Sequence, residues 1–317
     1  MTMQYSHPGI PADILALSHE RDELRKRGKY DRADALKRQI EEAGYGIKDN
    51  PHGAHLIILP SVDVDGVIYR TARQVPSLLD EVDLFEFSVN ILANTNFEET
   101  KRCVESVMRS TGTHEVELLL VHNKSLGELD AWFRELQRHD SRLHLLSTSR
   151  PLGVAEARNI SMKQSRGKYI LLLDTSVELM GDIFTPIEQI LEEKSIGITG
   201  FRGLRSEDLH HFDESTDTEV EVIDELCMAF QRKLLQKIGL FDERYRFPWY
   251  MAIDFNFALR NCGVRAVVTP SLPIKSYPPF HDTTLSDAER TRLKKRNFYR
   301  FLDKWGDRED LLLDNEE

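Results

Sequence analysis

The chain has 317 residues, of which 40% are hydrophobic and 30% charged, and its formal net charge at pH 7 is -11. This length and composition provide one large core with a smaller appendage, and no apolar run approaches the roughly 20 residues of a membrane-spanning helix. The acidic balance argues against a protein that wraps nucleic acid, although it permits a local basic patch for phosphate.

The three cysteines, Cys103, Cys227 and Cys262, are widely separated, and no histidine lies at metal-ligand spacing from them. We therefore expect small core residues rather than disulfides or a zinc site. The first residues lack the charged and apolar regions of an export signal, so the expected location is the cytoplasm.

The first predicted element is a helical hairpin, which defines an N-terminal part over residues 1–55. Two stretches with apolar residues at helical spacing are separated by Gly28 and closed by Gly44. The charged outer faces are expected to be solvated, and an interaction role is the alternative.

Residues 56–84 are predicted to form a small β-hairpin and a linker. The dipeptide Asp65-Gly66 is a turn signal between two β-rich runs, 55–60 and 67–70. A connector follows from residue 71 to residue 84.

Over residues 85–317, short apolar strands alternate with amphipathic helical segments. The expected strands are 87–93, 117–121, 143–147 and 169–173, and the expected helices are 98–108, 126–138 and 154–164. This alternation predicts an α/β domain, with a mainly parallel sheet and helices on both faces. Further along we expect helices at 183–192, 233–238 and 254–261, strands at 196–200 and 219–229, and a loop at 205–218.

The last predicted element is a helix at residues 288–305 with a basic outer face. An ordinary solvated helix packed on the core explains this pattern. Peripheral contact with a membrane surface or another anionic partner is the alternative.

The apolar strand at 169–173 runs directly into Asp174, which small polar residues follow. Ligands in open α/β sheets gather outside the carboxyl ends of the strands, so a carboxylate there is a candidate for chemistry. A simple turn residue is the competing interpretation.

Several segments carry a family resemblance together. They are 88–93 with 102–107, 121–125, 152–159, Leu173-Asp174-Thr175-Ser176, 238–243, 254–260 and Lys304-Trp305-Gly306. In this order they resemble the family 2 glycosyltransferases, whose nucleotide-sugar domain is of the GT-A type, over about residues 87–305. The resemblance implies transfer of a sugar from a uridine or guanosine diphosphate donor, with inversion, to a glycan, lipid or protein acceptor that the sequence does not specify.

The resemblance also implies a divalent metal held by an Asp-x-Asp motif, since Mg²⁺ and Mn²⁺ prefer oxygen ligands. The corresponding segment here is Asp174-Thr175-Ser176, which lacks the second carboxylate. Asp174 is therefore the predicted metal ligand and diphosphate neighbour, with weakened affinity for the metal.

Asp254 resembles the family's catalytic base, although Ile253 replaces the acidic residue that usually precedes it. A metal-binding histidine of the family aligns with Lys275, while His281 is the shifted alternative. If Lys275 is the counterpart, its ammonium can pair with diphosphate and partly replace the metal.

The nucleotide-sugar pocket is expected to include His122 and Asn123 at the end of one strand, where the family usually has an acid. Gly153, Arg158 and Asn159 belong to the family's Gly-to-Ala-Arg-Asn helix, and an arginine suits a diphosphate. The competing interpretations are a surface histidine, a turn asparagine and a salt-bridged helix arginine.

The acceptor side is expected at Trp249 and Tyr250, because aromatic rings stack on sugars, although core packing is the more frequent fate of such residues. Asp224 and Glu225 are further candidates for the polar wall of the site.

Residues 12–55 resemble the C-terminal helical end of bacterial cysteinyl-tRNA synthetases, on Arg32-Ala33-Asp34-Ala35-Leu36-Lys37 and Asp49-Asn50-Pro51-His52-Gly53. We interpret this segment as an interaction or packing module and do not expect nucleic acid as a partner. The alternative to an active enzyme is a catalytically degenerate relative that binds nucleotide or glycan as a scaffold.

Overall fold

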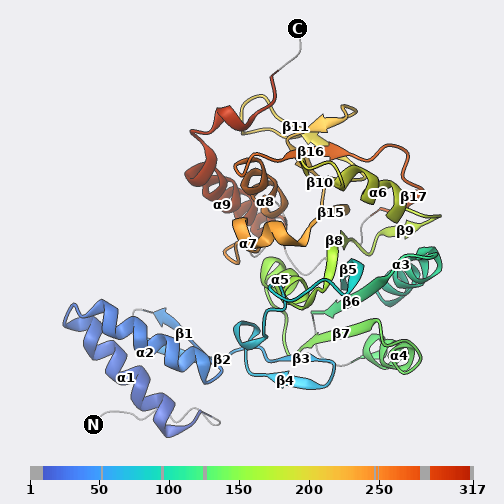
Figure 1. Cartoon of the computed structure of the whole chain (residues 1–317). Helices are drawn as coiled ribbons and strands as arrows, with labels where there is room; N and C mark the ends of the chain where they lie inside the picture. The colour runs from blue at the N-terminus through green and yellow to red at the C-terminus, as the bar shows by residue number, and fades with distance from the viewer. Residues whose placement is uncertain are drawn as a thin grey trace. The chain divides into compact units, whose positions relative to one another are not determined.

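The computed structural model describes residues 10–50, 53–93, 96–123, 127–245, 248, 250–278 and 286–314. Its internal contacts divide the chain into two compact units, Met1–Val75 and Pro76–Glu317 (Figure 1). Each unit is described separately below.

The first unit begins with the expected helical hairpin, α1 (Ala12–Lys26) and α2 (Tyr30–Glu42), with Gly28 in the left-handed region between them at φ 70°. A two-stranded antiparallel sheet of β1 (Tyr45–Asn50) and β2 (Gly53–Ile58) follows. Ile14, Ile40 and Leu56 form a small core that joins the helices to the sheet.

The hairpin around Asp65-Gly66 is formed by β3 (Val62–Val64) and β4 (Val67–Tyr69), followed by the 3-10 turn η1 (Ala72–Gln74). The expected first strand, 55–60, instead supplies most of β2 and pairs with β1. The difference arises because residues 45–50 form a strand that their mixed polar sequence did not indicate, and this strand takes the backbone groups of residues 53–58 as its partners.

The second unit alternates helices and strands. Its helices are α3 (Phe97–Ser110), α4 (Glu128–Gln137), α5 (Val154–Gln164), α6 (Phe184–Leu191), α7 (Leu235–Ile238), α8 (Met251–Arg260) and α9 (Asp287–Trp305), with 3-10 turns η2 (Arg232–Leu234) and η3 (Glu309–Leu311). Its strands are β5 (Phe85–Ala93), β6 (Val116–His122), β7 (Leu143–Thr148), β8 (Gly167–Leu173), β9 (Val177–Leu179), β10 (Ile196–Gly200), β11 (Gly203–Arg205), β12 (Asp213–Ser215), β13 (Glu219–Val220), β14 (Val222–Ile223), β15 (Cys227–Gln231), β16 (Arg265–Val268) and β17 (Ile274–Ser276).

The main sheet of this unit has the strand order β13-β16-β10-β15-β8-β5-β6-β7. The pairs among β5, β6, β7 and β8 are parallel, as is β10 with β16, whereas β15 runs antiparallel to both of its neighbours. The expected α/β fold is confirmed, and the sheet is mixed. The expected loop at 205–218 contributes β12 to a small side sheet with β11 and β14.

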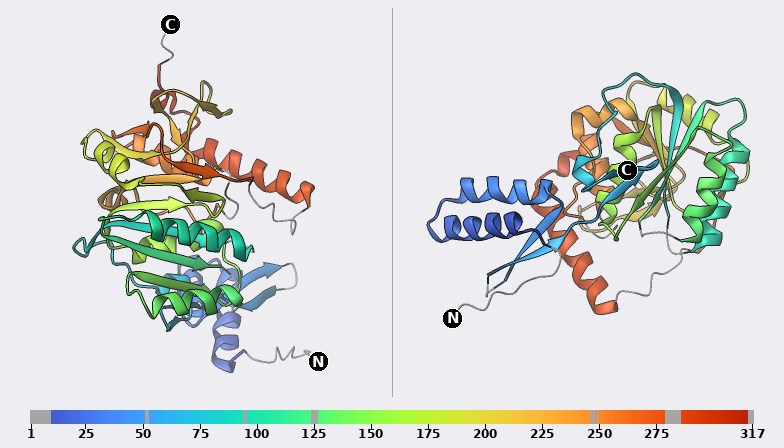
Figure 2. Two further views of the ribbon diagram at one scale, coloured as in Figure 1. Left: turned by 90° about the vertical axis from the view of Figure 1, so that its right-hand side faces the viewer. Right: turned by 90° about the horizontal axis from the view of Figure 1, so that it is seen from below.

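Alternating residues of the strands build two cores, one on each face of the sheet. Tyr169, Leu171 and Leu173 of β8 pack in the core that α3, α4 and α6 cover. Ile170 and Leu172 pack in the core of α5, α7, α8 and α9. Helices therefore cover both faces of the sheet (Figure 2). Successive side chains of a strand point to opposite faces, so apolar residues at consecutive positions need a cover on each face.

The final helix, α9, begins with a capping box in which Ser286 and Glu289 bond each other's backbone N–H groups. It buries Asn297, Phe301 and Trp305 and leaves most of its basic side chains exposed. Among the described residues, the helices lack the combination of length and apolar composition that crossing a membrane demands. Membrane-surface contact through residues 288–305 stays a prediction.

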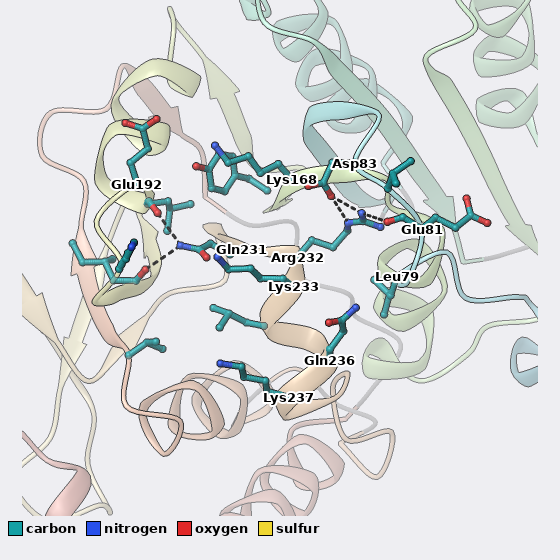
Figure 3. A pocket seen from close by; sticks show the side chains of 17 residues that line it. Leu79, Glu81, Asp83, Lys168, Glu192, Gln231, Arg232, Lys233, Gln236 and Lys237 are labelled. Carbon is teal, nitrogen blue, oxygen red and sulfur yellow. Dashed lines mark hydrogen bonds and ion pairs between the residues drawn. The ribbon is translucent and has the colours of Figure 1, made fainter.

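A cavity of about 750 Å³ lies at the start of β8 (Figure 3). Lys168 and Tyr169 of β8 line it together with Arg232, Lys233 and Lys237. Because Asp174 follows the other end of this strand, roughly 20 Å away at about 3.3 Å per residue, the cavity is separate from the expected site.

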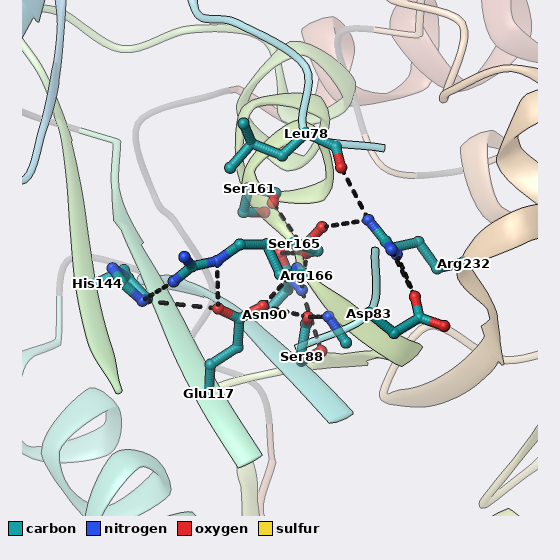
Figure 4. A network of polar contacts seen from close by, with 11 residues as sticks. Leu78, Asp83, Ser88, Asn90, Glu117, His144, Ser161, Ser165, Arg166 and Arg232 are labelled. Carbon is teal, nitrogen blue, oxygen red and sulfur yellow. Dashed lines mark hydrogen bonds and ion pairs between the residues drawn. The ribbon is translucent and has the colours of Figure 1, made fainter. Parts of the chain in front are cut away.

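Polar side chains join the strands at the same end of the sheet (Figure 4). The buried Glu117 carboxylate on β6 accepts hydrogen bonds from the Ser88 hydroxyl and the Arg166 backbone N–H, both at 2.5 Å. A Cβ at Gly167 would lie 2.4 Å from the backbone nitrogen of Ser88, so only glycine permits this close pairing of β8 with β5.

Arg232 holds the segment that leads into the sheet. It is buried and donates to the backbone carbonyls of Leu78 at 2.8 Å and Glu81 at 2.7 Å, and it pairs with Asp83 at 2.5 Å. This guanidinium is therefore satisfied by the protein, although it lines the cavity.

Candidate functional site

Asp174 stands immediately after β8, in a turn that its own side chain organises. Its Oδ1 accepts hydrogen bonds from the backbone N–H of Ser176 at 2.8 Å and from the Ser176 hydroxyl at 2.6 Å. Its backbone N–H donates to the carbonyl of Leu226 at 2.9 Å. Ser176 is thus a hydrogen-bond donor to Asp174 and does not offer a second anionic ligand beside it.

Arg158 reaches the same place from α5. Its side chain is buried, and Nη1 donates to the carbonyls of Asn90 at 3.1 Å and Leu173 at 3.5 Å. Burial lowers the pKa of Arg158, while the nearby carboxylates of Glu225 and Asp174 oppose that shift. The expected arginine and aspartate therefore lie within electrostatic reach of each other.

Glu225 and Asp224 come to this cluster from the segment before β15. Burial raises the pKa of Glu225 to about 7, and the charges of Asp224 and Asp174 add to the increase while Arg158 opposes it. Burial also raises the pKa of Asp224. The antiparallel register that sets Cys227 opposite Leu173 brings these residues beside Asp174.

A resident divalent metal does not fit the described side chains by themselves. Within the described ranges, no group of three or more His, Cys, Asp or Glu residues is arranged to hold an ion. One oxygen of Asp174 already accepts two hydrogen bonds from Ser176. A cation at this position would need oxygen donors from a bound ligand.

Lys275 lies on β17, which pairs antiparallel with β9 directly after the Asp174 turn and sets Lys275 opposite Glu178. Its exposed ammonium lies 4.6 Å from the centre of the Tyr277 ring, and contact with Tyr277 and the charge of Glu178 raise the pKa of Lys275. The backbone N–H of Tyr277 donates to the carbonyl of Ser176 at 2.9 Å. His281, the alternative to Lys275, lies outside the described residues.

His122 and Asn123 stand at the end of β6, and both have partners within the protein. Nδ1 of His122 contacts the buried Asp130 carboxylate on α4, which also accepts a hydrogen bond from Ser147. The Asn123 amide bonds the backbone of Leu152 in both directions, at 3.0 and 2.8 Å. These contacts orient His122 and hold the loop before Gly153.

Gly153 precedes the first residue of α5, and Asn159 lies in the middle of this helix. Gly153 is the N-cap with φ -63°, a conformation open to any residue, so its backbone requires no glycine. The Asn159 amide donates to the carbonyl of Phe241 at 2.9 Å and accepts from its N–H at 3.0 Å. Asn159 therefore joins α5 to the segment that precedes α8.

Asp254 is 5% exposed and lies beneath α9. Its Oδ1 accepts hydrogen bonds from Lys304 Nζ and Trp305 Nε1, both at 2.8 Å. Among the described residues, its hydrogen-bond partners differ from those of Asp174. The structure accounts for Asp254 as a link between α8 and α9, and its role as base stays a prediction.

Tyr250 packs in the second core rather than on an open surface. It is 9% exposed, has a left-handed backbone at φ 70°, and its ring centre lies 5.5 Å from that of Phe301 and 5.6 Å from that of Phe298. Trp249, the other expected acceptor-side residue, lies outside the described residues.

Comparisons with known proteins agree with this architecture. Residues 89–235 match the model of glycosyl transferase family 2. The crystal structure of GalNAc-T7 with UDP, GalNAc and Mn2+ has a TM-score of 0.60 and 16% sequence identity, over 73% of this chain and 50% of that one. The mannosyltransferase PcManGT from Pyrobaculum calidifontis, in complex with GDP-Man and Mn2+, has a TM-score of 0.51 and 13% identity, over 72% of this chain and 65% of that one.

A curated relative is the uncharacterized protein y4gI of Sinorhizobium fredii (strain NBRC 101917 / NGR234). It is 27% identical over 116 residues, which are 36% of this chain and 13% of that protein. The chain thus spans a small part of this relative and half of the GalNAc-T7 chain. The second unit has the fold of the GT-A glycosyltransferases, and its residues 89–235 carry the match to glycosyl transferase family 2.

Proposed function

We propose that the protein is a glycosyltransferase that uses a nucleoside diphosphate sugar. The proposal rests on the family match over residues 89–235 and on a fold shared with two proteins solved with UDP or GDP-Man. The observation that carries it is the cluster at the end of β8, where Arg158 donates to the carbonyl of Leu173 and the Asp174 N–H donates to the carbonyl of Leu226, the residue after Glu225. In such folds the carboxyl ends of the strands are the place where ligands bind.

In this proposal the donor is a uridine or guanosine diphosphate sugar. His122 and Asn123 would face the nucleoside and Asp174 the diphosphate, with Gly153, Arg158 and Asn159 building the wall behind it. Mg²⁺ or Mn²⁺ would bind only weakly, through Asp174 and the ligand's own oxygens, and Lys275 would supply part of the missing positive charge. Transfer would proceed by a single displacement with inversion at the sugar carbon.

Two carboxylates compete for the role of base. Asp254 has the family resemblance, but Lys304 donates to both of its oxygens and Trp305 to one of them. Glu225 lies beside Asp174, and its pKa of about 7 suits proton transfer near neutral pH. Our proposal retains Asp254 as the base, with Glu225 as the group to test against it.

Calorimetric titration with UDP and GDP, each with Mn²⁺ and with a chelator, tests the donor class. We expect micromolar to millimolar binding to at least one nucleotide, with affinities that differ less than about tenfold between the two conditions, because the metal ligands are incomplete. Strict dependence on Mn²⁺ would reject the role of Lys275. Absence of binding to both nucleotides in both conditions would reject the proposed function.

The base is tested with Asp254→Asn, Glu225→Gln and the control Lys304→Gln. We expect Asp254→Asn to abolish transfer or donor hydrolysis while nucleotide affinity stays within about threefold, since a base acts on the acceptor. Lys304→Gln breaks the same contact with α9 but retains the carboxylate, so it should remain active. If Glu225→Gln is inactive and Asp254→Asn is active, the base is Glu225.

The second candidate is a relative that binds nucleotide sugar without transferring it. It is favoured by Ser176, which stands where the metal motif has a carboxylate, and by the contacts that tie Asp254 to α9. Nucleotide binding combined with no donor hydrolysis across a panel of uridine and guanosine diphosphate sugars would support it.

A further inference from the structure

Arg102 on α3 has buried donors that the protein leaves unsatisfied. Its Nε and Nη2 atoms are buried and have no hydrogen-bond partner among the described residues. Its guanidinium carbon lies 3.7 Å from the centre of the Tyr277 ring, so the group is in cation–π contact with an aromatic face. A buried charged donor without an acceptor is costly, and a ligand is one of the few explanations for keeping it.

The same ring carries a second cation. Lys275 Nζ lies 4.6 Å from the Tyr277 centre, and the charge of Arg102 opposes the increase in the pKa of Lys275. The Tyr277 hydroxyl donates to Glu178 at 2.6 Å, and Arg109 approaches the other oxygen of Glu178 at 3.6 Å. Around the hydrogen-bonded pair of Tyr277 and Glu178, Arg102 and Lys275 thus lie over the ring and Arg109 approaches the carboxylate, so cationic side chains outnumber this carboxylate.

This cationic patch, formed by Arg102, Tyr277 and Lys275, adjoins the Asp174 turn. The backbone N–H of Tyr277 donates to the Ser176 carbonyl at 2.9 Å. Cys103, the next residue after Arg102, contacts the Asp174 carbonyl through its sulfur at 3.6 Å. The strand β9 begins directly after this turn, and β17, which carries Lys275, pairs with β9.

We propose that the cationic patch binds the diphosphate of the nucleotide donor, with Arg102 as its principal anion ligand. Arginine offers a planar fork of donors that matches phosphate oxygens, and the contact with Tyr277 restricts the motion of that fork before the ligand arrives. Lys275 adds a point charge. The patch thereby supplies positive charge at the turn where Ser176 has replaced a metal-binding carboxylate. This inference rests on the proposed function and specifies how its donor is held.

The test compares Arg102→Gln with Arg109→Gln, which removes the same charge from the same helix at a side chain that is 60% exposed. Titration with UDP, GDP and inorganic pyrophosphate, in the presence of a chelator, should show affinities weakened about ten- to hundred-fold by Arg102→Gln, as loss of a charge-assisted hydrogen bond implies. Arg109→Gln should change them less than about threefold. Binding of uridine or guanosine should be unaffected by either substitution.

The melting temperature without ligand separates a binding role from a structural one. Arg102→Gln removes the unsatisfied buried charge together with the contact with Tyr277, so the melting temperature should change little, whereas a mainly structural role of Arg102 would give a large decrease. Arg102→Lys keeps the charge without the fork and should recover only part of the affinity. A melting curve is recorded for each of Arg102→Gln, Arg102→Lys and Arg109→Gln, so a variant that folds poorly is identified before its affinity is interpreted.

The outcomes distinguish failure of the cationic patch from failure of the proposed glycosyltransferase function. Wild-type protein that binds UDP or GDP, with equal affinities in Arg102→Gln and Arg109→Gln, overturns the patch and leaves the proposed function standing. Pyrophosphate binding that depends on Arg102, without binding of either nucleotide, supports the anion patch and rejects the donor class. Failure of all three probes to bind the wild type overturns both.

Discussion

Glu225 connects the chemistry of the cluster to the pH dependence of folding. Its pKa is raised from 4.5 to about 7 because burial and neighbouring carboxylates disfavour its charge. The folded protein therefore binds this proton more tightly than the unfolded chain. The contribution of Glu225 to stability is complete below about pH 4.5 and is lost as the pH rises through about 7.

Glu225→Gln should consequently be more stable than wild type at pH 8, by up to about 3 kcal/mol at 1.36 kcal/mol per pKa unit, and nearly equal to it at pH 4. Denaturant unfolding at the two pH values measures the difference. Glu192→Gln, at an exposed position, serves as the control and should show neither effect. Equal behaviour of the two variants would mean that Glu225 is solvated.

The cysteines differ in exposure, contrary to the expectation that all three belong to the core. Cys103 and Cys227 are fully buried, and burial raises the pKa of Cys227 to about 12. Cys262 is an exposed free thiol, because it lies in the turn after α8, where the chain reverses at Gly263. A local pattern of apolar neighbours did not reveal this turn.

Native protein should therefore be alkylated by a maleimide at one thiol, since only an accessible thiolate reacts at a useful rate. Mass spectrometry should show a single adduct in the wild type and none in Cys262→Ser. All three thiols should react after unfolding. Rapid labelling of Cys103 without denaturant would show that α3 opens away from the Asp174 turn.

At the scale of elements, hydrogen bonds of the buried Asn256 side chain connect α8 to the side sheet. The Asn256 side chain accepts from the Ile223 N–H at 2.9 Å and donates to the carbonyls of Ile223 at 3.2 Å and Ala252 at 2.8 Å. Asn256 is fully buried, so water cannot replace these partners.

Asn256→Ala should lower the free energy of unfolding by about 3 kcal/mol, because a buried backbone pair loses its partners. Asn261→Ala, at the exposed end of the same helix, should cost less than about 1 kcal/mol. Urea unfolding compares the two. A cost of similar size at both positions would indicate that β14 finds other partners when Asn256 is removed.

At the scale of the whole molecule, the chain consists of two units with separate cores. The first unit has its own small cluster around Ile14, Ile40 and Leu56, while both large cores belong to the second unit. The division falls between Val75 and Pro76. The domain limits expected from the sequence and the resemblance to cysteinyl-tRNA synthetases stay predictions.

Deletion of residues 1–55 should leave a folded protein that binds UDP or GDP as the full chain does. The reason is that the residues of the Asp174 cluster and of the cationic patch all lie in the second unit. Circular dichroism and the same calorimetric titration are the measurements. Loss of nucleotide binding in a folded deletion variant would assign the helical hairpin a part in the site.

The sequence by itself determined the alternation of strands and helices from β5 to β8, because burial on two faces imposes a period that local patterns display. It also located Asp174 directly after a strand and Arg158 within the helix that precedes that strand. Only the tertiary structure decided that β15 enters antiparallel beside β8 and brings Glu225 to Asp174, and that β17 pairs with β9 and brings Tyr277 over Arg102. Strand pairing over such long separations depends on complementary edges in the folded chain, which no local pattern of residues records.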